Sequence, residues 1–424
     1  MSGLRFGFLT TFYPPYHFGG DAMGVQRLAQ ALARRGHRVT VIHDADAYLA
    51  LAAVPPAPGR AAGGADGVDV VTLKSPLGAV SSLLTQQTGR PIVHGAAIRR
   101  TLVARDVDVT VFHNVSLVGG PGLLGMGRGV TLYMAHEHWL VCPTHVLWRH
   151  GREVCTGREC LRCVLHYRRP PQLWRYTGYL ERQLGHVDAF IAMSEFSKAK
   201  HREFGFPRDM EVVPYFLPDA EPPSAEAPSD ASPHERPYVL FVGRLERIKG
   251  LDDVIPLFAR FDRADLLIAG DGEYAGTLRA LAAGNPRVTF LGRVSPAELS
   301  RYYRHALALV VPSVCFETFG IIIIEAFRQA TPVLARRIGP FPEILEHAGG
   351  GELFATAGEL EAALHRLLDE PGRRDRFARA GFAAFQTTWS ESAVVPRFLE
   401  VVRRAAERKG DRRVAEALTA EVAA

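Results

Sequence analysis

Short apolar runs alternate with segments of helical period along this chain, and this alternation constrains the fold more than any other feature. Residues 5–11 form an apolar run suited to a strand buried on both faces. Apolar residues then recur at helical spacing over 25–32 before the next such run. Further strands are expected at 38–43, 68–73, 108–112, 129–135 and 187–193. Strands that alternate with helices in this way predict a parallel sheet with helices on both faces.

A second series of the same kind follows a break in composition. Residues 218–236 are rich in Pro, Ala, Ser and acidic residues and have no apolar period, so we expect a linker there. Strands are then expected at 238–242, 265–269, 288–291, 307–311 and 332–335, and helices at 251–261, 296–305 and 319–329.

This organisation predicts an α/β protein of two facing, Rossmann-like, doubly wound domains with a ligand cleft between them. The N-terminal domain is expected over 1–217 and includes a Cys- and Arg-rich insertion at 140–176. The C-terminal domain is expected over 237–388. We expect the basic residues 389–424 to form one or two helices that pack back on the N-terminal domain.

Composition excludes several classes of protein. The chain has 424 residues, 47% hydrophobic and 22% charged, which is typical of a globular protein large enough for two domains. Its net charge of +5 favours anionic ligands but is too small to indicate nucleic-acid binding. No segment has the length and apolarity of a membrane-spanning helix, and the first residues lack the pattern of a signal peptide. We therefore expect a cytoplasmic location, with the inner face of the membrane as the alternative.

Two glutamates flank the predicted start of a helix in the second domain. Glu317 precedes this start, and Glu325 follows about two turns later, so both can lie near the helix N-terminus. Free backbone N–H groups at Phe319 and Gly320 can meet an anion there. This combination suits a sugar diphosphate, although two glutamates on a solvated helix face are common.

Two cations follow the first strand of the same domain. Arg244 and Lys249 stand at the carboxyl end of that strand, where open α/β sheets bind ligands. A guanidinium can grip phosphate oxygens through two donors, and an ammonium acts as a point charge. Glycine-containing turns at 270–272 and 292–294 converge on the same rim of the sheet.

These motifs together resemble glycosyltransferase family 4 of the GT-B fold. The match runs through GRLERIKG, IAGDG, FLGRV, VPS, Glu317 with Glu325, PVLA and Pro342-Glu343-Ile344, in order and spacing, over the whole second domain. The sequence departs from the family in three places. Ala330 with Thr331 replaces a glycine before PV, Gly339-Pro340 replaces a double glycine, and 321–324 is uniformly isoleucine.

The resemblance implies a role for each matching residue in binding a nucleotide diphosphate sugar. Arg244 and Lys249 would neutralise the donor diphosphate, and Glu317 would bond the hydroxyls of the donor sugar. The remaining assignments are Glu325 on the ribose, Phe319 and Gly320 on sugar or phosphate, and Arg293 with Val294 beside the base.

The first domain adds two elements that resemble the same family. Gly19 and Gly20 match a glycine pair whose N–H groups approach the diphosphate. The long loop that carries them does not fit a nicotinamide-binding fingerprint. His136 resembles a histidine that reaches the donor sugar, with His113 and His138 as the alternatives.

Two Asp-x-Asp strings could indicate a divalent metal, as in the other large class of glycosyltransferases. We interpret Asp44–Asp46 and Asp106–Asp108 instead as strand and loop ends, because strings this short arise easily by chance. With protein cations on the diphosphate, catalysis is expected to need no metal and no other cofactor.

Four cysteines form the most unusual feature of the sequence. Cys142, Cys155, Cys160 and Cys163 have the spacing C-x12-C-x4-C-x2-C within one expected loop. In a cytoplasmic chain this pattern suits a tetrahedral structural zinc better than disulfides, with an iron–sulfur cluster or unligated thiols as alternatives. The surrounding cations and aromatics suit either an acceptor site, a membrane surface or a solvated face; they are Arg149, Arg152, Arg158, Arg162, Arg168, Arg169 and Arg175 with Trp148, Tyr167 and Trp174.

The resemblance implies a retaining, metal-independent glycosyltransferase of hexosyltransferase type. The donor would be a nucleotide diphosphate sugar and the acceptor a hydroxyl group, lipid-linked or not, in the synthesis of a polysaccharide, glycolipid or glycosylated metabolite. Two alternatives remain open at this stage: a GT-B epimerase acting on a nucleotide sugar, and a non-catalytic nucleotide-sugar binder.

Overall fold

The computed structural model describes residues 3–52, 67–220 and 231–422. The chain forms two compact units, which we call the first unit (Met1–Tyr215 with Val394–Ala424) and the second unit (Phe216–Ala393). Within the expected linker 218–236, residues 221–230 lie outside the described part of the chain.

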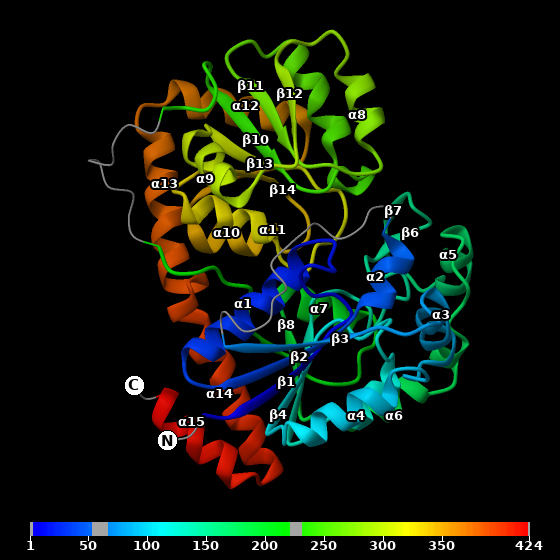
Figure 1. The fold of residues 1–424 in the computed structure, drawn as a ribbon. Helices are drawn as coiled ribbons and strands as arrows, with labels where there is room; N and C mark the ends of the chain where they lie inside the picture. Colours follow the sequence, from blue (N-terminus) through cyan, green and yellow to red (C-terminus); the bar gives the residue numbers. More distant parts are fainter. Residues whose placement is uncertain (1–2, 53–66, 221–230, 423–424) are drawn as a thin grey trace. The chain divides into compact units, whose positions relative to one another are not determined.

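The first unit contains a parallel sheet of seven strands in the order β3-β2-β1-β4-β5-β8-β9 (Figure 1). The chain starts at β1, winds to β3 on one side and then crosses back to β4, so the switch in winding direction lies between β1 and β4. The strands of this unit are β1 Arg5–Leu9, β2 Arg38–Asp44, β3 Val68–Leu73, β4 Val109–Phe112, β5 Val130–Ala135, β8 Ala189–Ala192 and β9 Glu211–Val212, with a separate antiparallel pair β6 Trp148–Arg149 and β7 Glu153–Val154.

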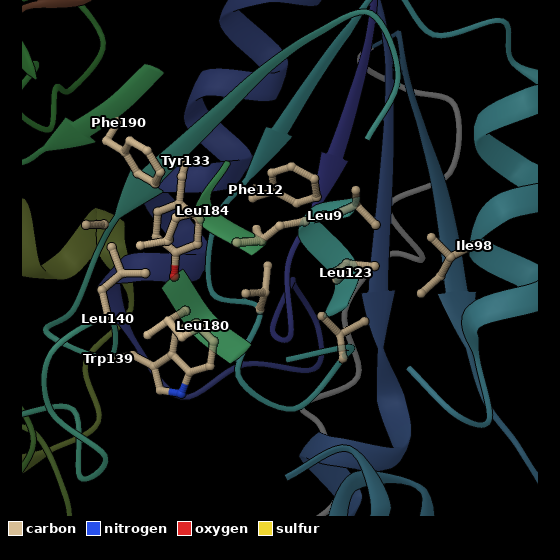
Figure 2. Close-up of a cluster of buried hydrophobic side chains, with 14 of the residues drawn as sticks. Leu9, Ile98, Phe112, Leu123, Tyr133, Trp139, Leu140, Leu180, Leu184 and Phe190 are labelled. Carbon is tan, nitrogen blue, oxygen red and sulfur yellow. The ribbon is translucent and has the colours of Figure 1, made fainter. Parts of the chain in front are cut away.

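Burial on both faces explains why the central strands are continuous apolar runs. All six residues of β5 and all four residues of β4 are buried. Figure 2 shows one resulting cluster, in which Phe112 and Tyr133 from the sheet lie near Leu180 and Leu184 of a covering helix. Trp139, which follows β5, completes this core and is fully buried.

Helices cover this sheet and close each parallel crossover. The long helix α1 has Asp21 in its first turn and Arg34 in its last, which complements the helix dipole. The helices of the first unit are α1 Gly20–Arg34, α2 Ala45–Leu51, α3 Ala79–Thr88, α4 Gly95–Ala104, α5 Cys160–His166, α6 Tyr179–Leu184, α7 Glu195–Glu203 and α15 Arg412–Val422, with 3-10 turns η1 Pro121–Met126 and η2 Leu173–Tyr176.

The chain returns to the first unit through α14, Glu391–Lys409, whose residues from Val394 onward belong to that unit. Phe398 of α14 packs against Phe6 of β1, with ring centroids 6.5 Å apart. Lys409 Nζ donates to Asp188 Oδ2 at 2.7 Å, and Arg413 of α15 pairs with Asp108. Aromatic packing and ion pairs thus tie α14 and α15 to the sheet of the first unit.

The second unit repeats the same winding with six parallel strands in the order β12-β11-β10-β13-β14-β15 (Figure 1). Here the winding direction switches between β10 and β13. The strands are β10 Tyr238–Val242, β11 Asp265–Ala269, β12 Val288–Gly292, β13 Ala308–Val311, β14 Val333–Arg336 and β15 Gly351–Phe354. The predicted strands agree with those observed to within two residues at each end.

One expected helix of the second unit is absent from the described residues. The segment 251–261, predicted as a helix, instead forms two 3-10 turns. Pro256 explains the difference, because proline lacks the N–H that a continuous α-helix would need there. The helical elements of this unit are η3 Arg247–Lys249, η4 Leu251–Asp253, η5 Ile255–Ala259, α8 Ala275–Leu281, α9 Pro296–His305, α10 Ile321–Arg328, α11 Phe341–Ala348, α12 Ala357–Asp369, α13 Arg373–Ala384 and the π-helical turn η6 Phe385–Trp389.

Across the described ranges, no helix combines the length and apolar character needed to cross a membrane.

Candidate functional site

The loops after β10 and β13 are packed together at the switch point of the second unit. The Val314 N–H donates to the carbonyl of Ile248 at 2.9 Å, which joins the two loops through their backbones. Gly250 has φ +72°, and a Cβ atom there would lie 2.1 Å from the carbonyl oxygen of Pro312. Only glycine permits so close an approach, so the sequence of the first loop is what allows the second to lie against it.

This contact brings Lys249 and Glu317 together. Lys249, the last residue of η3, donates from Nζ to Glu317 Oε1 at 2.6 Å. The Ser313 hydroxyl donates to the same oxygen at 3.2 Å. The two side chains are 20% and 26% exposed, so a ligand can reach both. Ser313 belongs to the motif VPS, and its contact with Glu317 could not be read from the sequence.

Each partner stabilises the charged form of the other. Burial by itself lowers the pKa of Lys249, but the Glu317 carboxylate outweighs it and the pKa is raised overall. Burial likewise tends to raise the pKa of Glu317, while the Lys249 ammonium and the Ser313 hydroxyl lower it below its usual range. Both groups are therefore ionised at neutral pH.

Arg244 adds a second cation to this site. Its charge acts on both Lys249 and Glu317, which places it in their electrostatic neighbourhood. Its Nη1 lies 2.8 Å from Glu246 Oε1, and its side chain is 58% exposed. An exposed guanidinium held at one side by a carboxylate keeps further donors for an anion.

The N-terminus of α10 lies a few residues after Glu317 in the chain. Gly320 is the N-cap residue and has φ +133°, and a Cβ atom there would meet Phe341 at 3.0 Å. Glycine therefore suits both the backbone conformation and the space. Phe319 is 3% exposed, so it can offer a ligand its backbone only. The first N–H groups of a helix lack intrahelical acceptors and favour an anion.

The other donor-site residues predicted in this unit lie on α10 and after β12. Glu325 is on α10, where the hydroxyl of the buried Tyr303 donates to its Oε2 at 3.1 Å. Arg293 and Val294 follow the edge strand β12, and the Arg293 side chain is 81% exposed with Asp271 at 3.9 Å. The contact with Tyr303 orients Glu325 and could not be read from the sequence.

In the first unit, the predicted glycine pair begins α1 beside the switch point between β1 and β4. Gly19 is the N-cap residue, and Gly20 is the first residue of the helix. A Cβ atom built on Gly19 would have no neighbour within 4 Å, so the space beside this backbone is open. The site is thus accessible to a ligand that binds N–H groups.

His136 lies in a buried chain of hydrogen bonds. Its Nε2 is 2.8 Å from Nδ1 of His113, and its Nδ1 is 2.5 Å from the Tyr215 hydroxyl. Burial lowers the pKa of His136 to about 4, so the ring is neutral at pH 7. Contact with a sugar would require one of these bonds to open. Of the two alternatives, His113 is part of this hydrogen-bonded series. His138 stacks on His201, with ring centroids 5.3 Å apart.

The two Asp-x-Asp strings have different surroundings. Asp108 accepts from the Arg5 N–H at 2.9 Å and pairs with Arg413. Asp44, Asp46 and His94 are buried together, with His94 Nε2 3.2 Å from Asp46 and 3.8 Å from Asp44. Among described residues, these three form the one set of potential metal ligands whose atoms all lie within 4.8 Å of one another. Asp44 also caps α2 by accepting from the Ala47 N–H at 3.2 Å.

The four clustered cysteines are all free thiols and line one small pocket. Cys142 precedes β6, Cys155 directly follows β7, and Cys160 and Cys163 are on α5. Their sulfur atoms are more widely spaced than the ligand atoms of the Asp44, Asp46 and His94 set. Cys315 lies elsewhere, buried in the loop after β13.

Two family models match this chain, one for each unit. The model described as Glycosyltransferase Family 4 matches residues 18–221, and that described as Glycosyl transferases group 1 matches residues 224–383. Together with the two Rossmann-like units, these matches define a glycosyltransferase of the GT-B fold. Within that class, the chain belongs to glycosyltransferase family 4.

Known proteins support the same assignment. The chain is 34% identical over 167 residues to D-inositol 3-phosphate glycosyltransferase of Thermobifida fusca, covering 35% of this chain and 38% of that one. The chain matches less than two thirds of the length of its curated relatives.

Solved structures of low sequence identity share the fold over nearly the whole chain. Sucrose-phosphate synthase from Thermosynechococcus elongatus has a TM-score of 0.72 at 20% identity, with 95% of this chain and 98% of that one covered. HepE of Anabaena in complex with UDP-glucose has a TM-score of 0.64 at 16% identity, with 94% and 99% covered.

Proposed function

We propose that this protein is a retaining glycosyltransferase that moves a hexose from a nucleotide diphosphate sugar to a hydroxyl group, without a catalytic metal. The observation that carries the proposal is the 2.6 Å contact between Lys249 Nζ and Glu317 Oε1, beside the N-terminus of α10. A cation can bind phosphate, and a carboxylate can accept hydrogen bonds from sugar hydroxyls. The two side by side suit a ligand in which a sugar is joined to a diphosphate. That a solved protein of this fold is a complex with UDP-glucose supports the choice of donor.

In this proposal, Lys249, Arg244 and the first N–H groups of α10 neutralise the leaving diphosphate. Negative charge builds on that group as the bond from the sugar C1 to the phosphate oxygen breaks. Fixed donors that face this charge stabilise the transition state more than the ground state. Three donor groups already present need no divalent ion to assist them.

The remaining residues hold the donor. Glu317 accepts hydrogen bonds from sugar hydroxyls, and Glu325, oriented by Tyr303, accepts from the ribose. Arg293 and Val294 border the base. In the first unit, Gly19 and Gly20 offer N–H groups to a diphosphate, and His136 is the candidate for a sugar contact. The acceptor oxygen attacks C1 from the side of the departing phosphate, and the acceptor proton passes to a phosphate oxygen. This front-face path retains the anomeric configuration without a covalent intermediate.

A lipid-linked acceptor and peripheral membrane contact form part of the same proposal. Leu161 and Leu165 lie one turn apart on α5 and are 50% and 57% exposed. Leu173 and Tyr176 on η2 are 67% and 63% exposed. Arginine side chains are frequent between these apolar residues, as in segments that bind anionic membrane surfaces.

The test is a screen of the purified protein against UDP-, GDP-, ADP- and dTDP-sugars, with and without EDTA. We expect one donor to raise the melting temperature and to be hydrolysed slowly and independently of EDTA. Lys249→Ala and Glu317→Ala should lose that hydrolysis by roughly 100-fold or more.

The control pair is Arg260→Ala and Glu361→Ala, which removes an ion pair of 2.7 Å near the opposite end of the second-unit sheet. These variants should keep both binding and hydrolysis. If no nucleotide sugar shifts the melting temperature, the proposal is wrong and a non-catalytic role is favoured.

A further inference from the structure

The four cysteines that the donor site does not use lie around a common pocket in the first unit. This pocket has a volume of about 20 Å³, and its lining includes Leu147 and Trp148 together with every one of the four thiols. In Figure 1 the hairpin strands β6 and β7 lie near α5, the helix that carries Cys160 and Cys163. Cys142 lies before the β6–β7 hairpin and Cys155 directly after it, and α5 carries Cys160 and Cys163 on one face, three residues apart.

Local hydrogen bonds already orient these sulfur atoms. The His150 N–H donates to Cys163 Sγ at 3.4 Å, as backbone N–H groups do toward metal-bound thiolates. Thr144 Oγ1 lies 3.3 Å from Cys142 Sγ, and the Cys155 thiol donates to the Gly157 carbonyl at 3.1 Å. Three of the four sulfur atoms are therefore oriented by hydrogen bonds within the segment around them.

Two of the histidines nearby are paired with carboxylates, whereas all four thiols line the pocket. His145 Nδ1 is 2.6 Å from Glu137 Oε2, and His150 Nε2 is 3.1 Å from Glu159 Oε2. A site of four thiols and no imidazole selects zinc or iron–sulfur among biological metals.

A partly buried cation lies beside the cysteines. Arg175 is near enough to Cys142 and Cys160 to interact with them electrostatically. Its Nη2 donates to the Trp139 carbonyl at 2.9 Å, and its guanidinium lies 5.1 Å and 4.7 Å from the ring centroids of Trp139 and Trp174. A metal bound by four thiolates carries net negative charge, which would compensate this cation.

The segment between the cysteines also has an unusual backbone. His145, Leu147 and His150 have φ values of +76°, +47° and +50°, in the left-handed region that non-glycine residues rarely adopt. Such conformations persist where the surrounding structure holds them. The two strands have two residues each and α5 has seven, so these elements alone provide little support for such conformations. A cross-link at the pocket would provide it.

We propose that Cys142, Cys155, Cys160 and Cys163 bind one zinc ion as four thiolates, and that this structural centre holds the β6–β7 hairpin against α5. A zinc–sulfur distance of about 2.3 Å requires the four sulfur atoms to lie closer together than they do in this structure. The centre is independent of the donor site in the second unit, and its test does not depend on enzymatic activity.

The experiment measures metal in the full-length protein, purified without added metal and without an affinity tag that binds metal. Elemental analysis should find about one zinc per chain in the wild type. Cys163→Ser and Cys155→Ser should lose it, whereas Cys315→Ser, the matched control in the second unit, should keep it. His94→Gln should keep it as well, since retention there excludes the Asp44, Asp46 and His94 set as the source of the zinc.

If a cysteine variant fails to fold, the wild type still decides the question. Titration with an organomercurial should release one zinc as the fourth clustered thiol reacts, detected by a metallochromic dye. Cobalt substitution should produce thiolate-to-cobalt charge-transfer bands and the visible bands of a tetrahedral ion. Iron with acid-labile sulfide in the purified protein would overturn the choice of zinc. Rapid reaction of all four clustered thiols with no bound metal, before and after incubation with zinc, would overturn the centre itself.

Discussion

Lys249 and Glu317 are separated by 68 residues in the chain, yet Lys249 Nζ lies 2.6 Å from Glu317 Oε1. The two side chains come from the loops that follow β10 and β13, the strands between which the winding of the second unit reverses. Without a ligand, each charge neutralises the other. A donor would therefore meet a cation and a carboxylate already held side by side.

This pairing predicts that Lys249 and Glu317 bind different parts of the donor. Lys249→Ala should weaken the binding of UDP and of UDP-glucose alike, by roughly tenfold to 100-fold, because a phosphate contact is lost. Glu317→Ala should weaken the binding of UDP-glucose by a similar factor. The variant should bind UDP at least as tightly as the wild type does, because Lys249 is then no longer paired with Glu317. Calorimetric titration with both ligands checks this, using whichever nucleotide the donor screen identifies. Equal losses for UDP in both variants would contradict the assignment.

Glu325 should act in donor binding and not in the chemical step. Glu325→Ala is expected to raise the KM for the donor about tenfold while kcat changes little, because a ribose contact contributes equally in ground and transition states. Tyr303→Phe, which removes the 3.1 Å hydrogen bond that orients Glu325, should give a smaller effect in the same direction. Steady-state kinetics with varied donor measures both. A large fall in kcat with KM unchanged would place Glu325 in the chemistry instead.

Buried histidines should make the first unit sensitive to acid. Burial lowers the pKa of His43 and of His201 to about 4, whereas in the unfolded chain the pKa of both lies near the ordinary histidine value of 6.5. Below about pH 6.5 the unfolded chain therefore binds protons that the folded chain does not. Stability is then fully present above that pH and is lost as the pH falls toward 4, on the order of 2 kcal/mol for each histidine by pH 5.

Urea unfolding between pH 7.5 and pH 5 measures this effect. His201→Gln should flatten the pH dependence, while His365→Gln, a change at an exposed position on α12, should leave it as in the wild type. Stability that stays constant over this range would show that the buried histidines take up protons in the folded state.

The departure from the family at Ala330 predicts a stabilising substitution. Ala330 has φ +53° and follows the last turn of α10, where its N–H donates to Phe327 and the Thr331 N–H donates to Ala326. This is the glycine position of a Schellman motif. Ala330→Gly should stabilise the protein by about 1 kcal/mol through relief of the left-handed strain. Ala380→Gly, inside α13, should destabilise it by about the same amount, and thermal unfolding distinguishes the two.

Membrane contact through α5 and η2 can be tested directly. We expect the protein to float with vesicles containing anionic lipid, and less so at high salt, because arginine contacts are screened. Replacing Leu161 and Leu165 with serine should reduce binding several-fold. Leu281→Ser on α8, also an exposed leucine, should not. Equal flotation of all three proteins would exclude this surface.

Sequence by itself determined the two α/β series, because apolar runs and helical spacing are local properties that burial imposes on each element. It also predicted residues of the candidate donor site in the second unit, since Arg244, Lys249 and Glu317 belong to motifs at strand ends. Even the type of a single element can be predicted wrongly from sequence. The segment that contains Pro256 forms 3-10 turns where a helix was expected, because proline lacks an N–H group.

Tertiary structure decided which distant side chains meet. The contact between Lys249 and Glu317 depends on β10 and β13 being neighbours, and the chain of His113, His136 and Tyr215 depends on residues up to 102 positions apart. The burial of His94 between Asp44 and Asp46 is of the same kind. Local sequence does not specify such pairs, because the strand order and the packing of helices on the sheet bring the partners together.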